Sequence, residues 1–468
     1  MFTHGSDIDV SVNYQDDQMK EHLYVETKTS FFTYFMVVNF GEYGMPSGNH
    51  LPSILVPTLT AKTPATRYDY GEALRLSILF YDAQRSGKLP ADNPIPWRHD
   101  SALQDSDGSV DLTGGWYDAG DHVKFNFPMA AATTNLLWGL VKWTDGYQSS
   151  GQLDMMYDMI KWPLQYFLKC WLPDTSTYYV QVGDGKLDFA YWGRAEDMTM
   201  ARPAFKVTQN NPGSDVADSA FSTKLLTAAK SLYKFAKDYK GIYSQSVPEA
   251  NLYYSSTGYR DELCLGAAWL YKATNDSQYL TDAKSFYDPA TAWAESWDEK
   301  KVSCQLLLFE LTKEDKYKNN VEAFMQSWMP GGSVPYTPCG LAFRIKWGSL
   351  RYAALMAADN GINSDAYKKW ALSQMNYILG DNNLHISYEI GFGSKYPQHP
   401  HHRGSSCPDA PNACTIQHQH SSSPNPNVLK GALVGGPGQN DDYVDNRNDY
   451  VKNEVAVDYN AGFQSALA

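Results

Sequence analysis

Apolar side chains recur every three or four residues along most of the chain after residue 67, which predicts helices that bury one face. The clearest stripe lies in 217–235, with Ser214 or Asp215 as its predicted N-cap. The same spacing predicts helices over 69–86, 128–145, 152–171, 261–274, 277–288, 300–313, 316–328, 348–359, 365–379 and 450–466, and a further one near 289–297. The pattern does not alternate strands with helices, so we expect an all-α fold.

Long connections separate these helices, at 88–126, 174–214, 330–347 and 381–448. Connections longer than about 15 residues inside a compact domain are commonly functional. We therefore expect a helical frame, over 67–468, that carries its chemistry on long loops at one end. Residues 1–66 are polar and differ from the rest, and we interpret them as an atypical N-terminal segment, disordered or the remnant of an appended module.

The composition narrows the classes of partner. The chain has 39 Lys and Arg against 52 Asp and Glu, a net charge of −13, and no basic cluster, which argues against nucleic acid. The apolar run 31–38 is far shorter than the roughly 20 residues of a membrane-spanning helix, and residues 1–20 do not read as a signal peptide. The 33 Tyr residues suit a carbohydrate groove or a stacked core.

The cysteines leave the cellular compartment open. Cys170, Cys264, Cys304 and Cys339 lie singly in apolar stretches, and we interpret them as buried small hydrophobic residues. Cys407 and Cys414 bracket a short loop, where a disulfide and two free thiols are both compatible with the spacing.

The segment GGWYDAGDHVKF contains the first candidate site residues, Asp118 and Asp121. Glycines allow the backbone to bring both carboxylates toward one point, where they could hold a water molecule for general-base catalysis. An Asp-capped turn is the alternative that this spacing leaves open.

A second candidate, Glu454, lies near the start of the predicted last helix, which Asn448 or Asp449 could cap. Apolar neighbours there would remove water from the carboxyl group and help it to keep its proton, as a general acid must. The alternative is a first-turn Glu that interacts favourably with the helix dipole.

The loop His399–Gly404 groups three histidines with Arg403. Zinc is one interpretation, with His418 and His420 as further ligands. The fixed charge of Arg403 favours a different one, in which Arg and neutral His grip sugar hydroxyls or orient a carboxylate.

Other stretches join oxygen ligands or aromatic rings. Gly258, Asp261, Glu262 and the later Asp298 offer the oxygen ligands that Ca²⁺ takes, although capping of the helix at 261 explains the same spacing. Tyr191–Arg194 and Trp347–Tyr352 each pair an aromatic ring with an arginine, as sugar-binding grooves do.

Together these segments resemble glycoside hydrolase family 9, the cellulases with an (α/α)6 barrel, and in particular its animal branch. The resemblance runs from about Tyr68 to Ala468 and rests on five stretches in the family's order: GGWYDAGDHVKF, WGRAEDMTMARPAF, YTPCGLAFRIKWGSLRYAA, HPHHRG and DYVDNRNDYVKNEVAVDYNAGFQ. It implies a barrel of six helical hairpins with long loops at one rim.

The resemblance implies an inverting endo-β-1,4-glucanase that acts on cellulose or a related β-glucan. Asp121 would be the general base, Asp118 would help to hold the attacking water, and Glu454 would be the general acid. Inversion needs the acid and the base about 6.5–9.5 Å apart, so Asp118 and Asp121 alone would not suffice.

The resemblance also implies the supporting residues. Those that bind substrate would be His401, Arg403, Trp347, Arg351, Tyr352 and Tyr459, with Asp445 in support. The chemistry would need no cofactor, and a structural calcium ion would be held by Thr257, Gly258, Asp261, Glu262 and Asp298. We expect a secreted monomer with a β-glucan as its partner, although no signal peptide is visible. Two alternatives stay open: a catalytically silent glucan-binding protein, and another six-hairpin enzyme such as a polysaccharide lyase or a sugar epimerase.

Overall fold

The computed structural model describes residues 67–215, 223–358 and 365–468. The predicted N-terminal segment 1–66 lies outside these residues. So does the beginning of the predicted helix 217–235. The expected N-cap residues Ser214 and Asp215 are described, and the Asp215 carboxylate accepts a hydrogen bond from the Tyr243 N–H at 3.0 Å.

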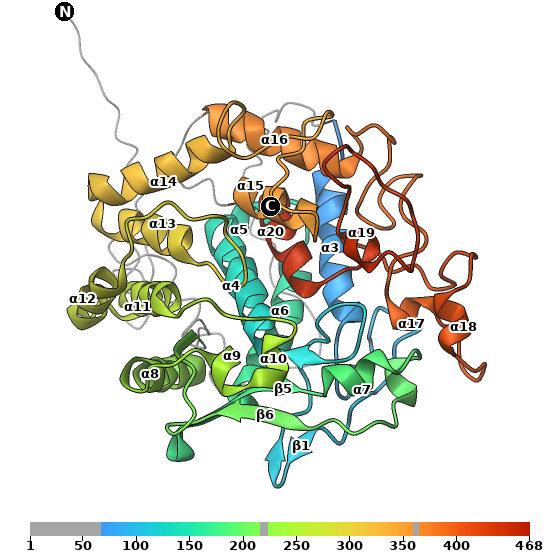
Figure 1. The fold of residues 1–468 in the computed structure, drawn as a ribbon, viewed down its shortest axis with the longest axis horizontal. Helices are drawn as coiled ribbons and strands as arrows, with labels where there is room; N and C mark the ends of the chain where they lie inside the picture. The colour runs from blue at the N-terminus through green and yellow to red at the C-terminus, as the bar shows by residue number, and fades with distance from the viewer. Residues whose placement is uncertain (1–66, 216–222, 359–364) are drawn as a thin grey trace, which may run out of the picture. The chain divides into compact units, whose positions relative to one another are not determined.

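The long helices lie close to their predicted positions (Figure 1). They are α3 (Tyr70–Ala83), α4 (Asn126–Lys142), α6 (Leu153–Cys170), α8 (Thr223–Asp238), α11 (Arg260–Thr274), α12 (Ser277–Phe286), α13 (Lys301–Thr312), α14 (Asp315–Trp328), α15 (Ser349–Ala358), α16 (Asp365–Leu379) and α20 (Val457–Leu467). Shorter helices lie in the connections: α5 (Thr144–Ser149), α7 (Gly185–Phe189), α9 (Tyr243–Ser246), α10 (Pro248–Asn251), α17 (Arg403–Ser406), α18 (Ile416–Gln419) and α19 (Tyr450–Asn453), with 3₁₀ turns η1 (Pro173–Thr175) and η2 (Ala195–Asp197).

The helices form an (α/α)6 barrel. Consecutive helices pack as hairpins, such as α11 with α12, α13 with α14, and α15 with α16. Figure 1 shows α4, α15 and α20 near the middle and α8, α12, α14 and α16 toward the outside. The inner helices are buried on nearly all sides, whereas α12 and α14 bury a single stripe. The sequence periodicity reflects this one-sided burial.

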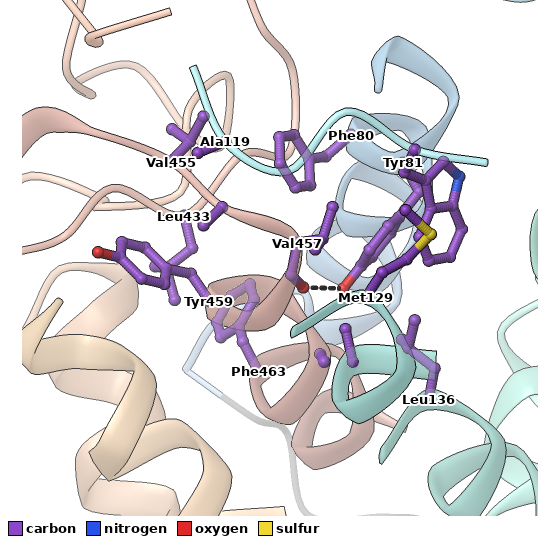
Figure 2. Close-up of a cluster of buried hydrophobic side chains, with 14 of the residues drawn as sticks. Phe80, Tyr81, Ala119, Met129, Leu136, Leu433, Val455, Val457, Tyr459 and Phe463 are labelled. Carbon is purple, nitrogen blue, oxygen red and sulfur yellow. Dashed lines mark hydrogen bonds between the residues drawn. The ribbon is translucent and has the colours of Figure 1, made fainter. Parts of the chain in front are cut away.

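The core of the barrel surrounds α20, which packs against α3, α4 and α15. Figure 2 shows Phe463 and Val457 of α20 against Tyr81 of α3 and Leu136 of α4. The Tyr81 hydroxyl donates a hydrogen bond to the carbonyl oxygen of Val457 at 2.7 Å. This bond holds the first residue of α20 in place.

A small antiparallel sheet lies beside the helices. Its strand β5 (Thr177–Val182) pairs with β3 (Lys124–Phe125), β4 (Trp171–Leu172) and β6 (Ala204–Val207), and a separate ribbon joins β1 (Ser106–Asp107) to β2 (Val110–Asp111). Lys124 lies opposite Val182 in this register. The sheet therefore anchors the chain directly after Asp121.

The prediction of a helix near 289–297 is wrong, because this segment is an irregular connection. Side chains satisfy the backbone there in place of helical hydrogen bonds: the Gln305 amide donates to the carbonyl oxygens of Asp288 and Ala290, at 2.9 and 3.1 Å. The Glu299 carboxylate accepts from the backbone N–H groups of Trp293 and Ala294. These bonds satisfy backbone N–H and C=O groups that a helix would otherwise pair.

Interpreting Cys264 and Cys304 as isolated buried residues is also wrong, because they form a disulfide between α11 and α13. Cys407 and Cys414 form a second disulfide, which closes the short loop. Cys170 is buried and free, and Cys339 is free and exposed. Among the described helices, none has the length and apolar character that crossing a membrane requires.

Candidate active site

Asp118 and Asp121 lie on a tight turn that leads into β3. The Asp118 N–H donates to the Val123 carbonyl at 3.0 Å, and the Val123 N–H donates back to the Asp121 carboxylate at 3.2 Å. Gly120 lies between the two carboxylates, against the backbone of the histidine loop. A Cβ atom there would overlap the carbonyl oxygen of His401. Glycine is therefore what allows the two loops to touch.

Glu454 lies outside the helices, so the prediction of one helix over 450–466 is wrong, and so is the alternative of a first-turn Glu. The predicted helix over 450–466 is divided into α19 and α20, and Glu454 lies in the extended segment between them. Asp449 does cap α19, as expected, by accepting from the Lys452 N–H. Because Glu454 is extended, its carbonyl accepts from the Gly435 N–H at 2.8 Å, and the residue pairs with His401 as a short parallel bridge.

Backbone hydrogen bonds join the three segments directly. The His401 N–H donates to the Asn453 carbonyl at 2.8 Å, and the Val457 N–H donates to the Asp118 carbonyl at 2.9 Å. The Arg403 N–H donates to the Gly120 carbonyl at 2.9 Å. The structure thus brings together Asp118, Asp121, His401, Arg403 and Glu454.

Asp118 is buried, and Asp121 and Glu454 are half-buried. Burial raises the pKa of Glu454 to about 8, and the negative charge of Asp121 adds to the effect. Burial also raises the pKa of Asp121 to about 7, assisted by Asp188 and opposed by Arg403. The pKa of Asp118 rises well above its ordinary value, first because it is buried and next because of Asp121.

Tyr254 is a site residue that the sequence analysis missed. Its hydroxyl donates a hydrogen bond to Asp118 Oδ2, while Asp118 Oδ1 is buried without a hydrogen-bond partner among the described residues. The adjacent tyrosines 253 and 254, in a loop next to predicted oxygen ligands, were the available signal. Asp118 thus keeps one oxygen that the protein does not engage.

The histidine loop is held by hydrogen bonds on both sides. His401 Nδ1 lies 2.7 Å from the Arg447 carbonyl oxygen, so Nδ1 carries the proton and donates it. Burial lowers the pKa of His401 to about 4, which keeps the ring neutral. Asp445 accepts from the N–H groups of Gln398 and His399, at 2.7 and 2.9 Å. Asp445 therefore supports this loop from behind.

Of the other predicted substrate-binding residues, Trp347 is exposed, whereas Tyr352 and Tyr459 are buried. The ring of Trp347 lies 5.5 Å from that of Tyr450, which in turn lies 5.9 Å from His401. Arg351 lies beneath, bound to Asp458 at 2.5 Å and to the Tyr352 hydroxyl at 2.9 Å. Its guanidinium also lies 5.1 Å from the ring centre of the buried Tyr459. The exposed rings form a row that leads to His401.

The predicted calcium ligands lie in one region but form few direct links to one another. Asp298 accepts from the N–H and the hydroxyl of Thr257, both at 2.8 Å. Asp261 accepts from the Lys300 N–H at 2.8 Å. Both carboxylate oxygens of Glu262 are buried without a hydrogen-bond partner among the described residues. The part of the chain that the structure describes contains no group of three or more His, Cys, Asp and Glu side chains that could hold a metal.

The barrel and its carboxyl groups define the class: an (α/α)6-barrel protein whose loops bring several carboxyl groups together. The model of glycosyl hydrolase family 9 matches residues 70–467, and the chain belongs to that family.

Similar proteins include the endoglucanase of the termite Nasutitermes takasagoensis, which is 47% identical with a TM-score of 0.82; the match covers 86% of this chain and 98% of the termite chain. Endoglucanase 14 of Arabidopsis thaliana is 38% identical over 89% of this chain and 96% of its own length. Endoglucanase B of Cellulomonas fimi is 44% identical over 89% of this chain. This chain covers only 43% of the length of the Cellulomonas fimi protein and 66% of Endoglucanase A of Bacillus pumilus.

The contact at Gly120 gives a first prediction. Gly120→Ala should lower hydrolysis of carboxymethylcellulose about 100-fold, because the new Cβ pushes the aspartate loop away from His401. Gly71→Ala is the control, since a Cβ there meets only ordinary contacts at 3.5 Å. Wild-type activity in a folded Gly120→Ala protein would contradict this account of the loop contact.

Proposed function

We propose that this protein is an inverting endo-β-1,4-glucanase, with Asp121 as its general base and Glu454 as its general acid. One observation carries the proposal: backbone hydrogen bonds hold Asp118, Asp121 and Glu454 at one rim of the barrel, with the carboxyl groups in an environment that raises the pKa of each. An inverting glycosidase needs one carboxylic acid that keeps its proton and one carboxylate that has lost it.

The chemistry follows from these two protonation states. Glu454 gives its proton to the oxygen of the glycosidic bond as the bond between that oxygen and the anomeric carbon breaks. A water molecule attacks the opposite face of that carbon, and Asp121 takes its proton. Asp118 orients this water, because Tyr254 binds one of its oxygens and leaves the other free. The new hydroxyl therefore has the inverted configuration.

The substrate class rests on the exposed aromatic rings and on the relatives. One family neighbour, Cel9M, is described in complex with cellobiose, and CelQ of Clostridium thermocellum in complex with cellotriose and cellotetraose. In this chain, Trp347 and Tyr450 offer flat apolar faces on the path to His401. A β-1,4-glucan presents the C–H faces that such rings bind, and so we assign cellulose or a related β-glucan as the substrate.

The proposed enzyme acts outside the cell as a monomer. Its two disulfides are typical of an oxidising compartment, and cellulose is too large to enter a cell. The residues of the proposed site all come from one chain, so a single subunit is sufficient.

We also propose that a structural calcium ion draws Thr257, Gly258, Asp261, Glu262 and Asp298 together, since their acidic side chains do not themselves form a metal-binding cluster in the described part of the chain. Glu262 supports this, because both of its oxygens are buried without a partner among the described residues, and nearby Asp261 and Asp215 add to the pKa increase that burial causes. A hard cation would satisfy these oxygens. The ion would stabilise the fold and take no part in the reaction.

Product configuration tests the mechanism. Proton NMR of cellotetraose hydrolysis at early times should show the α-anomer first. Glu454→Gln should lower kcat at least about 100-fold, because the leaving oxygen loses its proton donor. The exposed Glu249→Gln on α10 is the matched control and should match wild type. Early appearance of the β-anomer would refute inversion, and unsaturated products would indicate a lyase.

The pH dependence tests the assigned roles. Asp121 must be ionised, so kcat/KM should fall as the pH drops below about 7. Glu454 must be protonated, so kcat/KM should also fall as the pH rises above about 8. Each limb should approach a tenfold change per pH unit. A profile that stays flat from pH 5 to pH 10 would contradict both assignments.

Calcium binding is tested by stability. Adding calcium to chelator-treated protein should raise the melting temperature, by the equivalent of about 2.7 kcal/mol at a hundredfold excess over Kd. Glu262→Gln should lose this response, whereas Glu249→Gln should keep it. An unchanged melting temperature in wild type would refute the site.

A further inference from the structure

Asp188 is a buried acidic residue whose role neither the sequence motifs nor the catalytic carboxyl groups explain. It lies on the short helix α7, whose N-cap Asp184 accepts from the Leu187 N–H at 2.9 Å. Gly185, the first residue of α7, packs so closely that a Cβ would overlap the ring of Tyr253. The cap and this contact fix where Asp188 points.

Asp188 contacts both loops that carry the proposed site. Its Oδ2 forms an ion pair with Arg403 Nη1, and both side chains are almost completely buried, at 2% and 3% exposed. The same oxygen accepts from the N–H of His122, the residue after Asp121, at 3.3 Å. The ring atom Nδ1 of His122 lies 3.7 Å from Asp188 Oδ1. One carboxylate thus bridges the aspartate loop and the histidine loop.

Stability alone is a weak reason for this arrangement. A buried ion pair has a large desolvation cost and is often no more stabilising than apolar residues of the same size. Arg403 already has a backbone link to the aspartate loop, through Gly120. The ion pair additionally fixes the orientation of the Arg403 guanidinium relative to Asp121.

We propose that Asp188 is a positioning residue of the active site, which fixes the guanidinium of Arg403 relative to Asp121 and balances its charge there. The assignment rests on the proposed glucanase activity and deepens it. Asp188 itself acts through Arg403 and the backbone of His122, and it does not touch the substrate.

The charges around Asp121 determine what removal of Asp188 should do. Among the described residues, the titratable and charged groups that interact with Asp121 or Asp188 are Asp118, His122, Tyr191, Arg202, Tyr253, Arg403 and Glu454. Among them Asp188 raises the pKa of Asp121, whereas Arg403 and Arg202 lower it. Without the charge of Asp188, the two arginines act unopposed, and the pKa of Asp121 must fall.

Asp188→Asn is the direct test. Its kcat should fall about 10- to 100-fold as Arg403 loses its fixed orientation. The acidic limb of kcat/KM should move down by about one pH unit. Asp184→Asn removes a charge from the same helix while keeping a good N-cap, so it should leave kcat and the acidic limb of kcat/KM unchanged. A lower kcat with an unmoved acidic limb would show that Asp188 is merely structural and would overturn the proposal.

The reciprocal variant covers the case in which Asp188→Asn fails to fold. In Arg403→Gln, Asp121 loses the positive charge that lowers its pKa most while Asp188 remains, so the acidic limb should move up in pH. The alkaline limb should also move up, because Arg403 lowers the pKa of Glu454 as well. The double variant should have an acidic limb between those of the two single variants. Movement of both single variants in the same direction would overturn the proposal.

A measurement without substrate separates this inference from the proposed activity. Subtracting the potentiometric titration curve of Asp121→Asn from that of wild type isolates the proton of Asp121. The same subtraction is then made between Asp188→Asn and the double variant that also carries Asp121→Asn. The midpoint should be lower by about one pH unit in that background. An inactive wild type would refute the proposed function alone, whereas equal midpoints would refute the role of Asp188 alone.

Discussion

The hydrogen bond from the Val457 N–H to the Asp118 carbonyl is the link on which the site depends. The first N–H groups of a helix have no partner within the helix, and α20 satisfies one of them with the loop that carries the aspartates. Tyr81 binds the carbonyl of the same Val457 from the barrel core. The loop that carries the aspartates is therefore held against the first residue of the largely buried helix α20.

The same packing determines the electrostatics. Burial raises the pKa of Asp118, Asp121 and Glu454, and the negative charge of Asp121 raises the pKa of the other two further. Positive charge from Arg403 offsets this for Asp121 and Glu454, and Asp188 limits how strongly it does so at Asp121. The protonation states that hydrolysis requires result from this balance and not from any single residue.

Contacts from outside each segment explain where the predictions from sequence were wrong. The stretch near 289–297 has helical periodicity, but Gln305 and Glu299 supply its backbone hydrogen bonds from a distance in sequence. Glu454 was assigned to a helix for the same reason, and its pairing with His401 and Gly435 draws it into extended structure. Cys264 and Cys304 become partners only because α11 packs against α13.

The positions of the long helices can be predicted from sequence alone, since burial of one helical face leaves a period that is visible locally. Motifs in the sequence also indicated Asp118, Asp121, His401, Arg403 and Glu454, and the structure brings these residues together. Only the tertiary structure revealed the contacts of Tyr254 and Asp188, since each is defined by a partner more than 60 residues away along the chain. Hydrogen bonds and charge interactions of this kind depend on distance in space, which no local pattern of residues encodes.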